Sequence, residues 1–324
     1  MKENDFTSQE GSIASVKISI IIPTFNRRDV LFYCLKSLSN QTFPWNNFEI
    51  LVIDDGSTED IPSLIKEFNQ SLFIRYFRQD KKGQACAENL GIKHAEGEII
   101  LFLDNDMIST PGLVEEHFKS HKKYKNYIIR GSYANTSDYI NPETASEGRF
   151  YSSAFFINGN VSMTKELLLK AGMFDEDFSG YGWLDLELGV RLKKIGAKAI
   201  TNEKAFTYHY QKSVVIDDLA AIYKKEVERG HMGVLFYFKH PCLKVKLATM
   251  NPLVIFVGSL LYRFDWLNPL KGGKILSFLY NHKLNWFFNQ AVNLVAMSCY
   301  SFGVREALVR LRRDNIILKA YKKL

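Results

Sequence analysis

The chain has 324 residues, of which 46% are hydrophobic and 24% charged, a composition typical of a folded globular protein and not of a disordered one. Its net charge of +7 is unevenly distributed, because residues 231–324 hold 14 Lys and Arg against 3 Asp and Glu, whereas residues 1–230 hold 28 against 32. An acidic body with a basic C-terminal part argues against a nucleic-acid-binding core and favours a tail that meets an anionic surface.

The four cysteines are far apart in the sequence, without a CxxC pair or a His/Cys cluster. This spacing indicates buried thiols in a reducing compartment, neither disulfides nor zinc ligands. The first 15 residues are polar and lack the apolar segment of a signal peptide, so we expect a disordered arm and a cytoplasmic protein.

Residues 16–107 alternate predicted strands with predicted helices. Runs of apolar residues without alternation indicate strands that are buried on both faces, and segments with apolar residues at helical spacing follow them. We predict strands at 16–23, 48–53, 73–77 and 99–103, and helices at 29–38, 61–68 and 83–95. This order predicts an α/β fold with a Rossmann-like, mostly parallel sheet, right-handed crossovers and helices on its flanks.

Two carboxylates, Asp104 and Asp106, follow the apolar strand at 99–103. Ligands bind at the carboxyl ends of strands in open α/β sheets, and residues two apart on an extended chain point the same way. Both carboxylates therefore face one site, where hard oxygen ligands suit Mg²⁺ or Mn²⁺ together with substrate phosphates. The alternative is a loop that carries two aspartates, one of them capping a helix.

Four segments, in this order and spacing, resemble the family 2 glycosyltransferases of GT-A fold. They are IIPTFNR (21–27), VIDDGS (52–57), GQACAENLGI (83–92) and GEIILFLDND (97–106). The resemblance extends over about residues 16–215 and implies that a nucleotide-sugar donor lies across the first four strand ends. One departure is Glu88, which stands where relatives commonly have an arginine, so an arginine contact to the diphosphate is not carried over.

The resemblance also implies roles for individual residues on the donor side. Asp55 binds the uracil, Asp104 lies on the ribose side, and Asp106 holds an Mn²⁺ or Mg²⁺ ion that bridges the diphosphate. Other residues implied in donor binding are Pro23, Thr24, Asn26, Arg27, Gly83, Asn89 and Asn105.

The second half is expected to bind the acceptor. The segment FFINGNVSM (155–163) resembles the family's strand and turn beneath the sugar, with Gly159 and Asn160 at the bend. Residues 174–192 resemble a C-terminal galactosyltransferase-type motif, in which Gly182 and Trp183 contact the acceptor and Asp185 is the catalytic base. The family's neighbouring glutamate is replaced by a leucine here, which leaves the acceptor undefined.

Two polar residues near this motif have alternative interpretations. Glu187 and Arg191 have the i, i+4 spacing of an ion pair on one helix face, so Glu187 has a structural explanation and Asp185 is preferred as the base. His209 lies between two tyrosines and is either a packed histidine or, as the resemblance implies, the residue that completes the metal shell.

We predict a GT-A domain at 16–229, with a donor half at 16–107 and an acceptor half at 108–229, followed by a basic, apolar helical extension at 230–324. The apolar cluster at 253–262 is shorter than the ~20 residues of a spanning helix. Near the C-terminus, apolar residues at helical spacing between flanking arginines indicate a helix that lies on an anionic membrane, on the inner face of the cell membrane; the alternative is a packed subdomain or dimer contact. These apolar residues are Val304, Ala307, Leu308 and Leu311.

The sequence thus predicts an inverting, metal-dependent enzyme that moves a hexosyl or N-acetylhexosaminyl group from a nucleotide diphosphate sugar, most simply a UDP-sugar, to a hydroxyl of a glycan, glycolipid or peptide. A processive synthase is disfavoured because a QxxRW segment is absent, and a nucleotidyltransferase because residues 23–26 contain no glycine. The rival from another class is a non-catalytic nucleotide- or sugar-binding protein on a degenerate GT-A fold.

Overall fold

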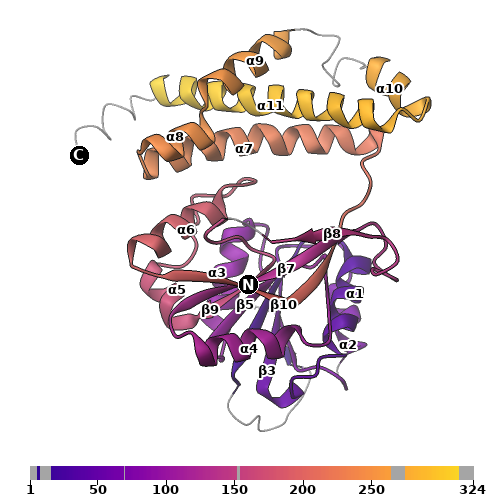
Figure 1. Ribbon diagram of the computed structural model, residues 1–324, viewed down its shortest axis with the longest axis vertical. Helices are drawn as coiled ribbons and strands as arrows, with labels where there is room; N and C mark the ends of the chain where they lie inside the picture. Colours follow the sequence, from indigo (N-terminus) through magenta and orange to yellow (C-terminus); the bar gives the residue numbers. More distant parts are fainter. Residues whose placement is uncertain (1–5, 8–15, 69, 152–153, 264–273, 314–324) are drawn as a thin grey trace. The chain divides into compact units, whose positions relative to one another are not determined.

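The structure is a computed structural model that describes residues 6–7, 16–68, 70–151, 154–263 and 274–313 (Figure 1). The chain forms two compact units. Unit 1 consists of Met1–Ser179 and Leu184–Lys212, and unit 2 consists of Gly180–Trp183 and Ser213–Leu324. The predicted boundary between residues 229 and 230 falls inside the continuous helix α7 (Leu219–Lys239), so the structure moves the main boundary to Lys212.

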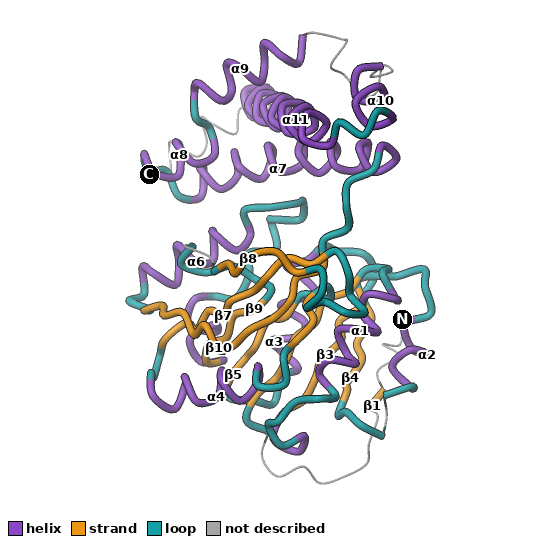
Figure 2. Tube along the Cα trace, turned by 45° about the vertical axis from the view of Figure 1, so that its right-hand side comes forward, coloured by secondary structure: helices purple, strands orange, loops and turns teal. Residues whose placement is uncertain are grey.

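Unit 1 is an α/β structure built on one sheet (Figure 2). Its strand order, among the described residues, is β1-β4-β3-β2-β5-β9-β7-β10-β6, with β8 paired to β7. The strands are β1 (Phe6–Thr7), β2 (Ile18–Thr24), β3 (Phe48–Asp54), β4 (Ile74–Arg78), β5 (Ile99–Leu103), β6 (Met107–Ser109), β7 (Tyr127–Thr136), β8 (Ser146–Phe150), β9 (Asn160–Thr164) and β10 (Lys198–Tyr210). The helices are α1 (Arg28–Leu38), η1 (Trp45–Asn47), α2 (Ile61–Lys66), α3 (Gln84–His94), α4 (Leu113–Lys123), α5 (Lys165–Ala171) and α6 (Leu184–Lys194).

The predicted parallel arrangement is confirmed for the donor half, where β4, β3, β2 and β5 are parallel neighbours. Beyond β5 the sheet is mixed, since β9 is antiparallel to both β5 and β7 while β10 is parallel to β7. Of the predicted disordered arm, β1 forms a two-residue strand antiparallel to β4, and the other residues of that arm lie outside the described part.

Helices cover both faces of the sheet because the inner strands are apolar on both sides. Ile18, Ile20 and Ile22 of β2 pack in one core cluster with side chains of α1, α2 and α4. Ile21 points to the opposite face, where α3 approaches so closely that a Cβ on Gly91 would clash with the isoleucine side chain. All seven residues of β3 are buried, as expected for a central strand.

Local sequence signals fix the ends of several helices. The Asp60 carboxylate accepts a hydrogen bond from the backbone N–H of Ser63 and caps α2, which has a proline in its first turn. Thr164 caps α5 in the same way, and Gly172 ends that helix in the left-handed conformation at φ +85°.

Unit 2 is helical, as predicted for the C-terminal extension. The long helix α11 packs along α7 and along α9, which lie on different sides of it (Figures 1 and 2). Glycines allow these close approaches: a Cβ on Gly230 or Gly303 would meet backbone of the opposite helix in the α7–α11 pair, and one on Gly258 would meet α11. The helices are η2 (Ile216–Asp218), α7, α8 (Leu243–Thr249), α9 (Pro252–Arg263), α10 (Lys274–Asn281) and α11 (Asn285–Arg313).

The apolar face predicted to lie on a membrane is used inside unit 2 instead. Val304 is fully buried in a cluster with Val234, Met250 and Tyr300, and the other three residues of that face pack against the cluster. The alternative interpretation, a packed helical subdomain, is therefore correct for this face of α11.

Candidate active site

The predicted site residues of unit 1 gather because the topology brings several strand ends to one edge of the sheet. The parallel strands β2, β3 and β5 end there with Thr24, Asp54 and Leu103. Strand β9 starts at this edge because its first residue, Asn160, pairs with Leu103. Strand β10 reaches it through His209, which pairs with Met107.

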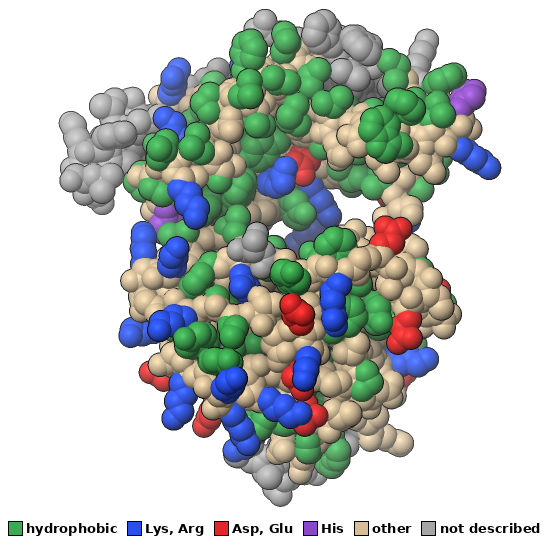
Figure 3. Space-filling model, viewed as in Figure 1, with side chains coloured by type: hydrophobic (Ala, Val, Ile, Leu, Met, Phe, Trp, Pro, Cys, Tyr) green, Lys and Arg blue, Asp and Glu red, His purple; other side chains and the backbone are tan. Residues whose placement is uncertain are grey.

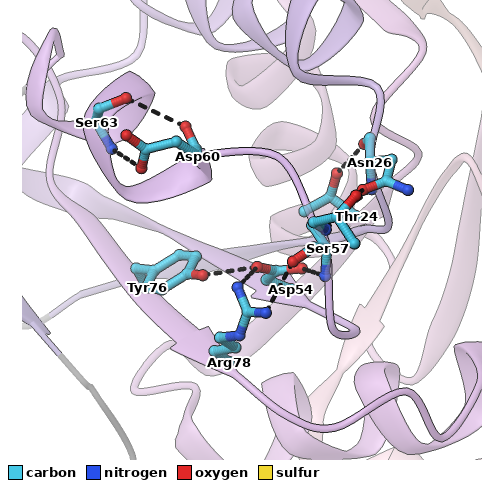
Figure 4. A network of polar contacts seen from close by, with 9 residues as sticks. Thr24, Asn26, Asp54, Ser57, Asp60, Ser63, Tyr76 and Arg78 are labelled. Carbon is cyan, nitrogen blue, oxygen red and sulfur yellow. Dashed lines mark hydrogen bonds and ion pairs between the residues drawn. The ribbon is translucent and has the colours of Figure 1, made fainter.

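The turn after β3 is organised by Asp54, which the sequence analysis did not single out (Figure 4). This fully buried carboxylate accepts hydrogen bonds from the Tyr76 hydroxyl at 2.7 Å, from Arg78 at 3.2 Å and from the backbone N–H of Ser57 at 2.7 Å. The Arg78 guanidinium also donates to the Ser57 carbonyl at 2.7 Å. Asp54 therefore shapes the turn, and the next residue, Asp55, is buried at 7% exposure and makes a separate set of hydrogen bonds.

Asp55 fixes the backbone of the segment that leads into α3. Its Oδ1 accepts hydrogen bonds from Gln79 and from the backbone N–H of Lys82, at 2.7 and 2.8 Å, and its Oδ2 accepts one from the backbone of Gly83 at 2.9 Å. Gly83 has φ +94°, which other residues rarely adopt. A carboxylate has about four acceptor positions, so one position on Oδ2 remains for a ligand N–H.

The turn after β2 is strained and tied to the turn after β3. Asn26 and Arg27 both have positive φ angles, 56° and 68°. The backbone N–H of Asn26 donates to the Ser57 hydroxyl at 2.7 Å (Figure 4), and its side-chain oxygen accepts from the backbone N–H of Thr58 at 2.9 Å. Left-handed non-glycine residues in succession cost free energy and are concentrated at ligand-binding sites.

The same turn reaches the strand of the two aspartates. Asn105 is buried and donates to the Thr24 hydroxyl at 3.0 Å, which joins the ends of β5 and β2. The guanidinium of Arg27 lies 2.8 Å from Asp106 Oδ2 and 3.4 Å from Asn105 Oδ1. Arg27 is thus a basic partner of Asp106, one that the sequence pattern did not reveal.

Asp106 also faces His209. The His209 Nε2 lies 3.6 Å from Asp106 Oδ1, and the backbone carbonyl of Asp106 accepts a hydrogen bond from the N–H of Tyr210 at 2.9 Å. Oδ1 is buried and has no hydrogen-bond partner in the described part of the chain. A carboxylate oxygen without a partner beside an imidazole nitrogen fits a divalent ion, which takes its other ligands from phosphates and water.

Asp104 lies against the bend before β9. A Cβ on Gly159, which has φ +106°, would stand 3.0 Å from Asp104 Oδ2, so only glycine permits this approach. Burial, reinforced by the negative charges of Asp106 and Asp185, raises the pKa of Asp104 to about 8. The carboxylates therefore form one electrostatically linked cluster.

Asp185 stands in the first turn of α6 and belongs to this cluster. Burial raises its pKa to about 6, although a hydrogen bond from the backbone N–H of Asn158 acts in the opposite direction. A carboxylate with a pKa near 6 is ionised at neutral pH and is a stronger base than an ordinary aspartate. Glu187 forms the predicted pair with Arg191, at 2.6 Å, and is buried away from the cluster.

Residues 19–175 match the sequence model described as glycosyl transferase family 2. Residues 19–175, which make up most of unit 1, belong to glycosyltransferase family 2. The chain is 30% identical over 238 residues to a chondroitin synthase of Escherichia coli and 31% identical over 240 residues to a hyaluronan synthase of Pasteurella multocida. Each match covers 60% of this chain, but only 34% and 25% of the respective synthase, so the chain spans about a third or less of these relatives.

The fold is that of solved GT-A glycosyltransferases. A mannosyltransferase from Pyrobaculum calidifontis, in complex with GDP-Man and Mn²⁺, matches with a TM-score of 0.60 at 17% identity, over 93% of this chain and 90% of the other. S. aureus TarS 1–349 in complex with UDP matches with a TM-score of 0.55 at 17% identity, over 93% and 92%. These similarities confirm the predicted fold class.

Two residues expected to bind ligands in this site have side chains that form hydrogen bonds to other groups of the protein instead. Asn89 is buried, its amide donates to the Phe174 carbonyl and to Glu176, both at 2.9 Å, and its oxygen accepts from the Phe174 N–H. It therefore fixes the segment after α5, and we do not retain it as a donor ligand.

Asn160 is likewise occupied by a buried network. Its oxygen accepts a hydrogen bond from His117 Nε2 at 2.8 Å, so Nδ1 of the neutral His117 ring accepts one from the Ser162 hydroxyl. The Ser162 oxygen in turn accepts a hydrogen bond from His121 Nε2. The Asn160 amide donates to the carbonyls of Ser132 and Ala205. Burial lowers the pKa values of His117 to about 4 and His121 to about 3, which keeps both neutral. This network positions Gly159 and leaves Asn160 without a free polar group for the acceptor.

Gly182 and Trp183, which the sequence placed at the acceptor, belong to unit 2. The Trp183 indole donates to the Arg229 carbonyl at 2.9 Å, and a Cβ on Gly182, which has φ +86°, would meet the Arg229 side chain. Their acceptor role remains a prediction.

The site contains a pair of side chains that the sequence analysis missed, Glu88 and Asn158. Glu88 was noted only as a departure from the family, and Asn158 was passed over beside Gly159. The amide of Asn158 donates to Glu88 Oε1 at 2.5 Å, and Glu88 is fully buried. The signal available in the sequence was the replacement of an arginine by an acid among the donor motifs.

Proposed function

We propose that the protein transfers a hexosyl or N-acetylhexosaminyl group from a nucleotide diphosphate sugar to a hydroxyl acceptor, with inversion at the anomeric carbon. The observation that carries this proposal is the position of Asp185, a partly buried carboxylate of raised pKa in the same cluster as Asp104, at the carboxyl edge of a family 2 domain. The relatives named as chondroitin and hyaluronan synthases support a role in glycan synthesis.

The proposed reaction is a single displacement. The acceptor oxygen forms a bond to the anomeric carbon while the bond from that carbon to the diphosphate oxygen breaks, and the nucleoside diphosphate leaves with the electron pair. Asp185 removes the acceptor proton as its oxygen attacks. The Asn158 N–H donates to the Asp185 carboxylate and holds it in position for this transfer.

A divalent ion, Mn²⁺ or Mg²⁺, would be held by Asp106 and His209. Such an ion offsets the charge that develops on the departing diphosphate. The Gln211 amide donates a hydrogen bond to His209 Nδ1 at 3.3 Å as it is oriented here. An ion held by Nε2 would require the opposite amide orientation, in which the Gln211 oxygen accepts a hydrogen bond from the Nδ1–H group. Arg27, beside Asp106, supplies a second positive charge for the phosphates.

A UDP-sugar is the proposed donor. The remaining acceptor position on Asp55 Oδ2 suits the N–H of a uracil ring. TarS was solved with UDP and with UDP-GlcNAc, whereas the mannosyltransferase was solved with GDP-Man, so proteins of this fold bind different nucleotides. A panel of UDP- and GDP-sugars, with and without Mn²⁺, tests the proposal by thermal shift, because a ligand that binds only the native state raises the melting temperature.

The rival function is binding without catalysis. An assay for free UDP separates the enzyme from the binding protein. An enzyme transfers the sugar of a bound UDP-sugar to an added sugar or to water and so releases UDP, whereas a binding protein releases none. Retention of Asp104, Asp106 and Asp185 in one electrostatic cluster favours the enzyme.

We further propose that unit 2 binds an anionic membrane surface through α8 and α9, on the inner face of the cell membrane. Leu253 and Phe256 of α9 are 70% and 64% exposed, and Leu243 of α8 is 71% exposed. Figure 3 shows apolar side chains gathered over the α9 and α10 parts of unit 2. Lysines at 244 and 246, both exposed, lie among the apolar residues of α8 and supply the charge that attracts anionic headgroups.

A surface position is favoured over a membrane span. Leu243–Tyr262 is long and apolar enough to cross a bilayer by length and composition, and only 28% of it is buried. Residues 250–251 nevertheless divide it into helices of 7 and 12 residues, each shorter than the ~20 residues needed to span.

A further inference from the structure

Glu88 and Asn158 each keep a buried oxygen without a hydrogen bond of good geometry. The two side chains are joined by the hydrogen bond from Asn158 Nδ2 to Glu88 Oε1, at 2.5 Å. Glu88 Oε2 and Asn158 Oδ1 are buried, and neither makes a hydrogen bond of good geometry within the described ranges of the chain, although the side chain of Gln84, one turn earlier on α3, approaches the Glu88 carboxyl group. Unpaired buried polar atoms are rare in native proteins, and a ligand is one of the few explanations for them.

The pair lies between the residues that serve the two substrates. The backbone N–H of Asn158 contacts Asp185, and the next residue, Gly159, touches Asp104. Glu88 is fully buried, and burial together with the negative charges of the nearby Asp104 and Asp185 raises its pKa well above its usual range. In the proposed reaction the transferred sugar occupies the position between the diphosphate and the base.

The chemistry of the pair selects the part of the donor that it contacts. A carboxyl group at position 88 has no positive charge with which to bind a diphosphate, so the charged half of the donor is not its ligand. The Asn158 oxygen accepts a hydrogen bond, and the Glu88 carboxyl group accepts one or, when protonated, donates one. The neighbouring hydroxyl groups of a sugar ring match this pair, because a hydroxyl both donates and accepts.

We propose that Glu88 and Asn158 form a subsite that binds two hydroxyl groups of the transferred sugar and so selects the donor. This inference rests on the proposed function, since it needs a nucleotide sugar. It assigns Glu88 to substrate recognition, with Asn158 linking that recognition to the orientation of Asp185. A sugar that lacks one of these hydroxyls leaves a buried acceptor unpaired and is disfavoured for that reason.

The test compares binding of UDP with binding of the UDP-sugar that raises the melting temperature most. We expect Glu88→Ala to weaken binding of the UDP-sugar roughly 10- to 100-fold, the loss expected when a buried polar group loses its hydrogen-bond partner, while UDP binds as it does to the wild type. Glu88→Gln restores part of the affinity, because a hydroxyl can accept from its amide. The control is Glu176→Gln, which changes a glutamate that pairs with Asn89. In this variant the ratio of UDP-sugar affinity to UDP affinity should equal that of the wild type.

A series of monodeoxy UDP-sugars provides the decisive measurement. The wild type should lose affinity when either of two ring hydroxyls is removed. Glu88→Ala should bind the parent UDP-sugar and the analogue that lacks the hydroxyl contacted by Glu88 equally well. If Glu88→Ala weakens UDP and UDP-sugar equally, or neither, the pair is structural or holds water, and the inference is wrong while the proposed function stands. If no nucleotide sugar binds the wild type, the proposed function fails and the subsite fails with it.

Discussion

The guanidinium of Arg27 lies 2.8 Å from the carboxylate of Asp106, although 79 residues separate them in the sequence. Arg27 therefore neutralises Asp106 in the ligand-free protein and competes with a metal ion for it. The same guanidinium, about half exposed, is free to turn towards phosphates when a nucleotide binds. Because Arg27 contacts Asp106 and can also contact phosphates, its removal should change the affinities for Mn²⁺ and for UDP in opposite directions.

Arg27→Ala should strengthen Mn²⁺ binding in the absence of nucleotide and weaken UDP binding, each by roughly tenfold, the size of a charge-assisted contact. The first change follows from loss of the competing cation and the second from loss of a phosphate partner. Calorimetric titrations of Mn²⁺ and of UDP measure the two separately. Arg28→Ala is the control, because Arg28 pairs with Glu67 on the surface. Two changes of the same sign contradict the competition.

Asp106→Ala should abolish the effect of Mn²⁺ on UDP affinity. Asp106 Oδ1 is the unpaired buried carboxylate oxygen beside His209, so its removal leaves one protein ligand at the proposed ion. UDP is titrated against wild type and variant with and without Mn²⁺, and Asp29→Ala, an exposed aspartate of α1, serves as the control. An equal response to Mn²⁺ in wild type and Asp106→Ala removes Asp106 from the metal site.

Asp185→Asn should bind the donor normally and lose transfer by roughly 10²- to 10⁴-fold, since an amide cannot accept the proton. Because only the ionised base is active, kcat/KM of the wild type should rise with pH and level off above about 6, the pKa of Asp185. Glu187→Gln is the comparison: it breaks the pair with Arg191 and lowers stability, with transfer largely retained. Normal transfer by Asp185→Asn assigns the base elsewhere.

The buried histidines predict an acid-sensitive fold. The pKa values of His117 and His121 in the folded state, about 4 and about 3, lie below the value of an exposed histidine. At acid pH the unfolded chain therefore binds protons that the folded state does not bind. The contribution of the two histidines to stability is complete above pH 6.5 and is lost as the pH decreases towards 4. The carboxyl groups of raised pKa, Asp104 and Asp185, act in the opposite direction. The slope reaches about 1.4 kcal/mol per pH unit for each histidine.

Urea denaturation between pH 7.5 and 4.5 measures this slope. His117→Gln should be less stable at pH 7 but show a smaller loss on acidification, because one of the two neutral histidines is gone. His282→Gln, an exposed position on unit 2, is the control and should follow the wild type. The same pH dependence in the wild type and in His117→Gln would show that the His117 ring is solvated in the folded state.

The donor half was predictable because its signals are local. The unbroken apolar run at 99–103 gave β5 with the same bounds, and the strand at 48–53 and the helix at 83–95 differ from β3 and α3 by a residue or two. Once these elements are parallel, their ends meet at one edge, so the cluster around Asp104 and Asp106 followed from the sequence. The helical nature of the C-terminal part was predictable for the same reason.

Long-range polar pairs carry no such signal. The contact between Glu88 and Asn158 joins residues 70 apart, and nothing periodic marks either of them. Asn89 and Asn160 carried family roles, yet their amides are taken by backbone groups that only the folded chain brings near. In unit 2, helical spacing identified the apolar face around Val304 correctly, but spacing does not distinguish a face that packs on α7 from one that meets lipid.

The proposed membrane face predicts binding to anionic vesicles. The full chain should co-sediment with vesicles that contain phosphatidylserine or phosphatidylglycerol at low salt, and less at high salt, because each basic residue near such a surface contributes about 1 kcal/mol that salt screens. Substitution of both Leu253 and Phe256 by glutamate should abolish binding, since it places charge on the most exposed apolar positions of α9.

Leu169→Glu is the matched control for this experiment, because Leu169 is 51% exposed but lies on α5 of unit 1. It should leave vesicle binding unchanged. Analytical ultracentrifugation of the chain without vesicles measures its oligomeric state. It therefore decides whether lipid or a second copy of the chain covers the exposed face of α8 and α9. If the protein stays in the supernatant at low salt, and forms a dimer that the α9 substitutions dissociate, then α8 and α9 form a subunit interface and the membrane proposal is wrong.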